Sequence, residues 1–179
     1  IGERHIVAAK TQSAGRGRRG NTWSSDEGGA WFTFCLEEDK NINSDYYAKL
    51  PFIVGASVAS VLSEITEKDI FLFKWVNDVY ADNRKISGIL VEKSGRRYVI
   101  GIGINVNNKI EKEFDRQRIS LVDVTGKMFD IDEIMVKTAE KFYEYFSLMI
   151  MGGWAEIYSY ICERDYLNGK TITVVNDGE

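Results

Sequence analysis

Two polar segments of the sequence carry the side chains best suited to chemistry. Residues 15–20 (GRGRRG) pack three glycines and three arginines into six positions. Such a backbone can approach an anion closely, and guanidinium forks match carboxylate and phosphate groups. Residues 74–78 (KWVND), followed by 85–88 (KISG), place amide, carboxylate and ammonium groups between apolar runs, where polar groups are costly unless they are paired or used. Together the two segments indicate a site that activates an acyl group.

The first segment, called the arginine loop below (residues 15–20), matches neither common nucleotide-binding motif. It lacks the Lys-Ser/Thr pair of a phosphate-binding P-loop, and the chain has no dinucleotide fingerprint between a strand and a helix. Its forked donors and backbone N–H groups can instead close over a carboxylate or a phosphate. The alternative interpretation is a flexible basic surface loop.

Two side chains flank the arginine loop. Trp23 could stack on a purine or on the apolar body of a ligand, and the alternative is a tryptophan of the core. Gln12 could pair with an amide-like group of a substrate, or it could be an ordinary exposed loop residue.

The second segment offers an electrophilic lysine and a carboxylate. Lys85 could bridge a substrate carboxylate and an α-phosphate and stabilise the charge that develops as they react. Asp78 could bind the magnesium ion that accompanies a triphosphate. The alternative is a solvated hairpin with an Asx turn.

Further on, residues 101–105 (GIGIN) put two glycines on one strand face, which leaves room for a ligand against the backbone and lets Asn105 read an adenine edge. The alternative is a core strand that its glycines make less stable.

Composition narrows the class of protein. With 179 residues, of which 44% are hydrophobic, the chain can bury one core, and its length also leaves room for the start of a second domain. A net charge of -4 disfavours general nucleic-acid binding, which needs a broad basic surface. The sequence has neither a membrane-length apolar run nor a signal-peptide pattern, which predicts a soluble cytoplasmic protein without a membrane partner. Cys35 and Cys162 are predicted to be buried free thiols.

The elements expected to position these residues alternate between strands and helices. Residues 5–9 predict a short buried strand, 12–29 a long loop and 30–36 an aromatic, β-branched strand. Apolar residues at helical spacing predict a core-facing helix over 49–65, with Pro51 in its first turn. The predicted loop over 12–29 exceeds about 12 to 15 residues, and loops of that length are usually functional or disordered.

The rest of the chain continues as strands and then as helices. Strands are expected over 70–75, 79–81, 86–91 and 98–106, with turns short enough for antiparallel neighbours. Helices are expected over 131–151, capped by Asp130 or Asp132, and over 154–164, before a last strand over 170–175. This order predicts an α+β fold with a mixed, mostly antiparallel sheet rather than a doubly wound parallel one.

Taken together, three blocks resemble the catalytic domain of biotin protein ligases, also called biotin–[acetyl-CoA-carboxylase] ligases. The blocks are the arginine loop with Trp23 after it, residues 74–78 followed by 84–92 (RKISGILVE), and residues 101–107 (GIGINVN). The resemblance implies a fold similar to class II aminoacyl-tRNA synthetases. It also implies a catalytic domain over 1–168, without its N-terminal part, and the start of an SH3-like domain over 169–179.

The resemblance further implies an ATP-dependent enzyme. Biotin and ATP would give biotinyl-5'-adenylate and pyrophosphate, and the biotinyl group would pass to a lysine of a biotin carboxyl carrier protein. ATP with magnesium and biotin are thus the expected small molecules, the carrier is the expected partner, and a homodimer is possible.

Residue by residue, the resemblance implies three overlapping sets. The catalytic residues would be Lys85, Arg18 and Asp78, with Asp78 also the candidate for magnesium or for orienting the attacking lysine. Biotin would contact Gln12, Arg16, Gly17, Arg18, Lys85, Gly88 and Gly103. ATP would contact Arg18, Arg19, Trp23, Asn77, Asp78, Lys85 and Asn105.

The chain departs from the family pattern in several places. Val76 replaces the usual proline of the second block, and Asn21 stands where some members have arginine. No upstream Ser-Thr-Asn motif or helix-turn-helix precedes Ile1, so we expect an upstream portion to be missing and no repressor role. A lipoate-protein ligase, which shares the fold and the lysine, and a non-catalytic biotin-binding domain are the competing hypotheses.

Overall fold

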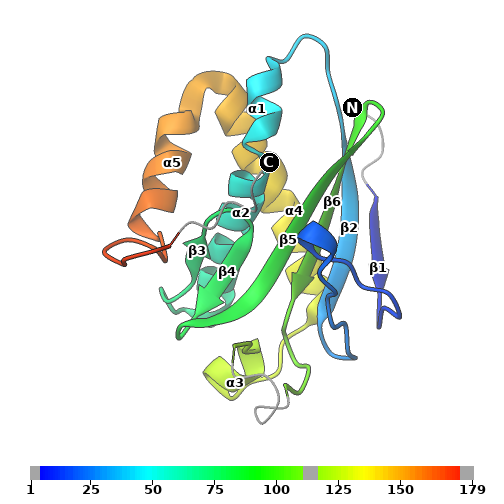
Figure 1. The fold of residues 1–179 in the computed structure, drawn as a ribbon, viewed down its shortest axis with the longest axis vertical. Helices are drawn as coiled ribbons and strands as arrows, with labels where there is room; N and C mark the ends of the chain where they lie inside the picture. The colour runs from blue at the N-terminus through cyan, green and yellow to red at the C-terminus, as the bar shows by residue number, and fades with distance from the viewer. Residues whose placement is uncertain (1–4, 111–116, 174–179) are drawn as a thin grey trace.

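A six-stranded antiparallel sheet forms one layer of the molecule, and helices form the other (Figure 1). The computed structural model describes residues 5–110 and 117–173. The sheet order is β1-β2-β6-β5-β4-β3, and every neighbouring pair of strands is antiparallel. The strands are β1 (Ile6–Ala9), β2 (Ala30–Glu37), β3 (Leu72–Lys74), β4 (Asp78–Ala81), β5 (Arg84–Ser94) and β6 (Arg97–Ile104). The predicted α+β class is therefore confirmed.

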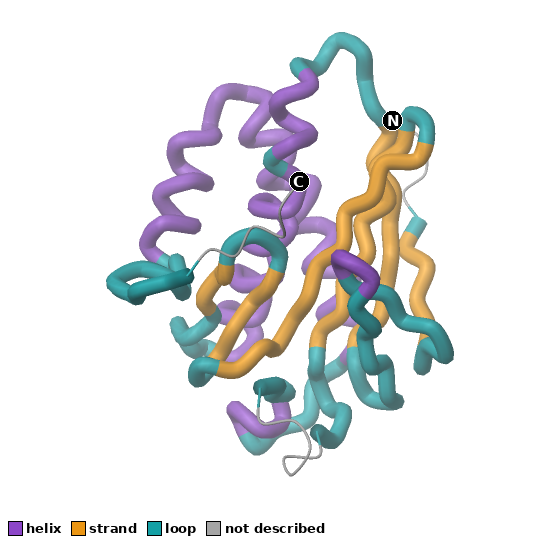
Figure 2. Tube along the Cα trace, viewed as in Figure 1, coloured by secondary structure: helices purple, strands orange, loops and turns teal. Residues whose placement is uncertain are grey.

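The longer helices lie together on one side of the sheet (Figure 2). The α-helices are α1 (Ser44–Ala48), α2 (Leu50–Thr66), α3 (Leu121–Thr125), α4 (Ile131–Leu148) and α5 (Trp154–Glu163). A 3₁₀ turn, η1 (Arg18–Gly20), lies in the arginine loop, and a π-helical turn, η2 (Met149–Gly153), joins α4 to α5. Pro51 is in the first turn of α2, as predicted. No helix in the described ranges is long and apolar enough to span a bilayer.

The helix-facing side of the sheet holds the core. Alternate residues of β2 and β6, such as Phe34 and its partner Ile100, are buried against this layer. They pack in one cluster with side chains of α2 and α4, including Leu62 and Phe142. Because successive strand residues point to opposite faces, the residues between them face the side that the helices leave open. The arginine loop crosses that open face (Figure 1).

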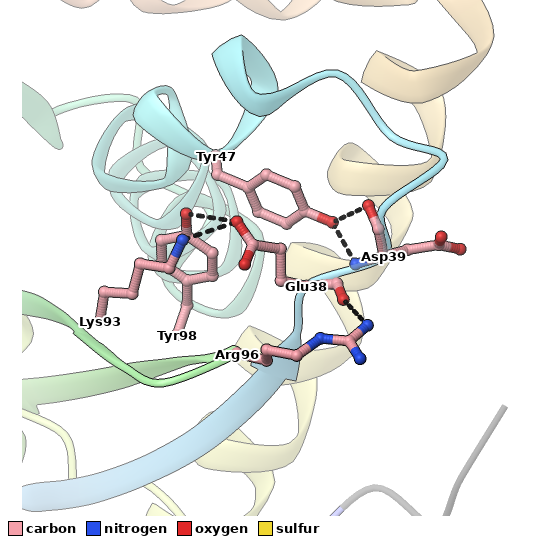
Figure 3. Close-up of polar contacts among 6 residues, drawn as sticks. All are labelled: Glu38, Asp39, Tyr47, Lys93, Arg96 and Tyr98. Atoms are coloured by element: carbon pink, nitrogen blue, oxygen red, sulfur yellow. Dashed lines mark hydrogen bonds and ion pairs between the residues drawn. The ribbon is translucent and has the colours of Figure 1, made fainter.

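A polar cluster closes one end of the sheet (Figure 3). Lys93 of β5 donates to Glu38 at 2.7 Å, and this hydrogen bond lowers the pKa of the Glu38 carboxyl below its ordinary value. Arg96 donates to the backbone oxygen of Glu38 at 3.2 Å. The rings of Tyr47 and Tyr98 stack with their centroids 4.8 Å apart. These contacts tie α1 and the β5–β6 hairpin to the end of β2.

Three sequence predictions about burial and extent differ from the structure. β1 is exposed along its whole length rather than buried, because it is an edge strand with a single partner. Cys35 and Cys162 are exposed free thiols rather than buried ones. Within the described part of the expected last strand, residues 170–173 form no strand, and 174–175 lie outside the described residues.

The cap of α4 gives a test of the fold. Asp130 accepts hydrogen bonds from the backbone N–H groups of Asp132 and Glu133 at 2.9 and 3.2 Å. We predict that Asp130→Ala lowers the free energy of unfolding in urea by about 1 kcal/mol. Asp130→Asn keeps an equivalent cap oxygen and is expected to stay close to wild type. Equal losses in both variants would contradict the capping role.

Candidate active site

A β-bulge decides which way Lys85 points. In the β4–β5 pair, Asp78 lies opposite Gly88 and Val79 opposite Ser87, but Tyr80 lies opposite Lys85. Ile86 is therefore the extra residue of a bulge, and its side chain is fully buried in the core. If the strand had no bulge, strict alternation from Gly88 would turn the Lys85 side chain to the helix side. The bulge brings Lys85 to the open face that Asp78 occupies.

The two side chains form an ion pair on that face. Lys85 Nζ lies 2.7 Å from Asp78 Oδ1, and the side chains are 24% and 20% exposed. The ammonium group also lies 5.0 Å from the centre of the Trp23 ring. In such a partly desolvated place each charge needs its partner. The predicted catalytic lysine and carboxylate are thus in direct contact.

The backbone of Lys85 is held on its other side by the segment before α3. Its N–H donates to the carbonyl of Gln117 at 2.7 Å, and its carbonyl accepts from the N–H of Ile119 at 3.0 Å. A capping box between Ser120 and Asp123 starts α3 directly afterwards. Sequence analysis missed this short helix, although the spacing of Ser120 and Asp123 is a recognisable signal.

The segment from Gln12 to Ser25, which contains the arginine loop, folds back on itself across the open face. Isolated bridges pair Gln12 with Ser25 and Arg16 with Thr22. At Gly15 an added Cβ would lie 2.3 Å from the carbonyl oxygen of Trp23, so this close approach of two backbones requires glycine. The long loop is therefore an ordered double-stranded excursion with η1 at its tip.

Two arginines tether the loop at different places. Arg18 donates to Asn77 Oδ1 at 3.1 Å, and Asn77 in turn donates to the carbonyl of Ile89 at 3.0 Å. Arg16 makes a bidentate pair with Glu92, at 3.1 and 2.8 Å. The loop is thereby bonded both to the β3–β4 turn and to β5.

Trp23 lies flat against a gap formed by two glycines. Gly88 and Gly103 are direct partners in the β5–β6 pair. A Cβ at Gly103 would lie 2.6 Å from Trp23 Nε1, and one at Gly88 would lie 2.7 Å from Trp23 Cζ3. The ring also meets Trp31 edge-on, at 6.1 Å between centroids. The room that these glycines create is therefore used here by Trp23, whereas Gly101 has only ordinary contacts beyond 3.5 Å.

Loop and sheet together enclose a cavity of about 330 Å³. It brings together every predicted site residue except Asn105: Gln12, Arg16, Gly17, Arg18, Arg19, Trp23, Asn77, Asp78, Lys85, Gly88 and Gly103. Residues from three distant parts of the sequence therefore share one space. Among the described residues that line it, four are cationic and one, Asp78, is a carboxylate. The cavity is suited to a ligand that carries negative charge.

Asn105 lies outside this lining. Its side chain is fully buried, and its Oδ1 accepts from Asn108 Nδ2 at 3.1 Å. Its backbone N–H donates to Ile86 at 2.9 Å, and its carbonyl accepts from Leu121 at 3.1 Å. Asn105 thus joins the bulge to the start of α3 and is not among the residues that line the cavity.

The apolar walls of the cavity were not among the predicted site residues. Trp31, Phe32, Ile89, Leu90 and Ile102 line it together with the polar groups. Trp31 lies opposite Gly103 and Leu90 opposite Gly101 in the sheet. Once the strand register is known, the glycine positions identify these neighbours; the sequence alone does not supply that register.

The donor set limits what metal the cavity could hold. Within the described ranges, no three His, Cys, Asp or Glu side chains gather into a metal-binding group. Magnesium commonly takes only one or two protein carboxylates and completes its shell with phosphate oxygens and water. Asp78 fits that mode, as a single ligand.

The comparisons with known proteins all point to the same protein family. Residues 2–107 match the model of the Biotin/lipoate A/B protein ligase family. The bifunctional ligase/repressor BirA of Bacillus subtilis is 31% identical over 155 residues, covering 78% of this chain and 46% of that protein. Biotin–protein ligase 2 of Arabidopsis thaliana is 25% identical, covering 85% and 48%. The chain spans about half the length of these relatives.

Solved structures agree in fold. The biotin protein ligase of Aquifex aeolicus, in complex with biotin and ATP, superposes with a TM-score of 0.80 at 35% identity, covering 90% of this chain and 68% of that one. The biotin protein ligase of Leishmania major, in complex with biotinyl-5-AMP, has a TM-score of 0.78 at 21% identity, covering 99% and 77%. The second likeness concerns the fold alone.

The glycine gap gives a test of the site geometry. We predict that Gly103→Ala displaces the Trp23 ring, because the new Cβ would overlap it, whereas Gly101→Ala leaves the ring in place. Acrylamide quenching of tryptophan fluorescence checks this, with Trp23→Phe identifying the signal of Trp23. Gly103→Ala is expected to raise the quenching of that signal. Equal quenching in the two alanine variants would contradict the packing described.

Proposed function

This chain belongs to the Biotin/lipoate A/B protein ligase family, and from its cavity we propose that it activates biotin with ATP and transfers biotin to a lysine of a biotin carboxyl carrier protein. The observation that carries the proposal is the ion pair of Lys85 and Asp78 beneath the arginine loop. One ammonium group and three guanidinium groups surround a space in which two anions, a carboxylate and a triphosphate, would have to meet. Their mutual repulsion is the barrier that such a site must lower.

In the first step, a carboxylate oxygen of biotin forms a bond to the α-phosphorus of ATP. The bond from that phosphorus to the bridging oxygen breaks, and pyrophosphate leaves with the electron pair. Negative charge builds on the α-phosphate oxygens during this exchange. Lys85 is the donor fixed on the sheet, and Arg18 is the donor that comes from the loop. Both act without reorganising, since their positions are set by the fold.

In the second step, the amine nitrogen of the carrier lysine forms a bond to the acyl carbon. The bond from that carbon to the phosphate oxygen breaks, and AMP leaves. The amine also loses a proton, which passes to solvent water. Asp78, the one carboxylate among the described lining residues, would orient the amine and accept an N–H hydrogen bond from it.

The two substrates divide the cavity by chemistry. Trp23 would offer an aromatic face for the adenine, and Asn77, which also lines the cavity, would be a polar partner. Gln12, Arg16 and Gly17 would meet the polar parts of biotin, and the apolar walls at Trp31 and Leu90 suit its hydrocarbon chain. Asn105 is buried and its Nδ2 has no hydrogen-bond partner among the described residues, and it stays a candidate partner for the adenine.

Magnesium would be held by the triphosphate, with Asp78 as one protein ligand, and would neutralise phosphate charge. The carrier is the proposed protein partner, and an ATP-consuming reaction fits the cytoplasmic location predicted from the sequence. We also predict that an SH3-like domain begins at residue 169 and that the protein can form a homodimer.

Pyrophosphate exchange tests the proposal and its nearest competitor. Labelled pyrophosphate is incorporated into ATP only if the acid forms an acyl-adenylate reversibly. We expect exchange with biotin, and none with lipoate or octanoate at the same concentration. Exchange with lipoate in place of biotin would move the assignment to the lipoate branch of the family, and absence of exchange with all three acids would defeat the enzyme assignment.

Lys85 gives a sharper test of mechanism. We predict that Lys85→Met slows biotin-dependent exchange by about 100-fold or more, because one preorganised donor is lost from the transition state. The matched control is Lys93→Met, which removes a lysine of the same strand that pairs with Glu38 instead. Circular dichroism and thermal unfolding establish that both variants fold. Exchange at the wild-type rate in Lys85→Met would refute the catalytic role.

Arg18 is predicted to retain the intermediate. Its guanidinium lies on the loop that covers the cavity, and a charge-assisted hydrogen bond to the adenylate phosphate stabilises by about 1.5–3 kcal/mol. We expect Arg18→Ala to release preformed biotinyl-adenylate about 10- to 100-fold faster, measured by rapid filtration. An unaltered release rate would argue that the loop does not contact the phosphate.

A further inference from the structure

The contact between Arg16 and Glu92 links the middle of the arginine loop to the sheet. Both guanidinium Nη atoms donate to the carboxylate, at 3.1 and 2.8 Å. Glu92 lies on β5 opposite Val99, on the open face of the sheet. Parallel, bidentate bonds of this kind fix orientation as well as distance. The pair therefore sets both the position and the plane of the Arg16 guanidinium.

The pair leaves much of Arg16 available for another contact. A guanidinium group has five N–H donors, and Glu92 uses two of them. Arg16 also lines the cavity. The same side chain can thus be held by Glu92 and still donate toward a ligand.

Glu92 itself is not part of the cavity lining. Glu92 lines a second hollow of about 500 Å³ together with loop residues and Leu90. A direct contact between this carboxylate and an anionic substrate would also be repulsive. Any effect of Glu92 on the site must therefore act through the loop.

Two arginine contacts hold the loop at two different places. Arg18 reaches Asn77, and Arg16 reaches Glu92 on β5. Gly17, between them, bonds back within the loop through its N–H to the carbonyl of Asn21 at 2.7 Å. Arg18 and Arg16 therefore hold this part of the loop to the β3–β4 turn and to β5.

We propose that Glu92 is a positioning residue, which aligns Arg16 and keeps the arginine loop over the cavity before substrate arrives. The inference rests on the proposed function, because the benefit lies in binding biotin to a preformed site. Preorganisation lowers the ordering cost of binding. Glu92 thus acts on the affinity for biotin and leaves the chemical step to Lys85 and Arg18.

The expected size of the effect follows from exposure. The Arg16 and Glu92 side chains are 70% and 42% exposed, so water weakens their attraction, and the bidentate geometry places the pair at the stronger end of exposed ion pairs. We therefore expect Glu92→Gln to change loop closure and biotin binding by about three- to fivefold. A large loss of kcat is not expected.

Trypsin digestion tests the structural half of the proposal without any substrate. The peptide bonds after Arg18 and Arg19 lie in the loop, and cleavage there requires the loop to open. Glu92→Gln is expected to speed this cleavage about three- to fivefold, as followed by mass spectrometry. The matched control is Glu38→Gln, which breaks the Glu38–Lys93 pair at the end of the sheet (Figure 3) and should leave loop cleavage unchanged. Unchanged cleavage in Glu92→Gln would overturn the proposal.

Exchange kinetics test the functional half. Glu92→Gln should raise the KM for biotin about three- to fivefold with kcat within about twofold of wild type. In an Arg16→Gln background the same substitution should add nothing, because its partner is gone. An unchanged KM, or a lower one, would overturn the proposal, the latter by showing that Glu92 competes with substrate for Arg16. If the wild type itself shows no exchange, the proposed function fails, and the cleavage comparison still decides whether Glu92 holds the loop.

Discussion

The half-buried ion pair of Lys85 and Asp78 is the interaction on which the arrangement of the site depends. Two charges taken out of water need close, well-directed partners, and here the partners come from adjacent strands. A one-residue bulge at Ile86 lets the core keep an apolar side chain while Lys85 turns to the opposite face. Backbone bonds from 117–119 then hold the lysine in place. The cation that we propose to be catalytic is thereby fixed without disturbing the core.

The one-sided layering of the fold explains why there is room for a site. Helices cover only one face of the sheet, which leaves glycines and a few polar groups on the other (Figure 2). The arginine loop covers that face and brings its cations with it. Trp23 rests on Gly88 and Gly103, so side chains at these two positions would lift the ring away. The loop, the two glycines and the ion pair therefore depend on one another for their positions on the open face.

Residue types, spacing and the family resemblance were enough to predict the α+β class, most strand and helix positions and eleven of the residues that line the cavity. They could not supply strand register, so Trp31 and Leu90 were missed although they lie opposite the conspicuous glycines. Asn105 was expected at the nucleotide because an asparagine after a glycine-rich strand suggests recognition. Its burial and its bond to Asn108 arise from tertiary contacts that no local pattern reveals. The exposure of β1 likewise follows from its place at the sheet edge.

The central claim is that Lys85 from the sheet and Arg18 from the loop converge on one reacting phosphate. The most direct measurement is a crystal structure of the protein with a non-hydrolysable biotinyl-adenylate analogue. We predict that the phosphate-mimicking group accepts hydrogen bonds from both side chains, with the biotinyl chain between Trp31 and Leu90. An analogue bound with that group in contact with neither Lys85 nor Arg18 would contradict the account.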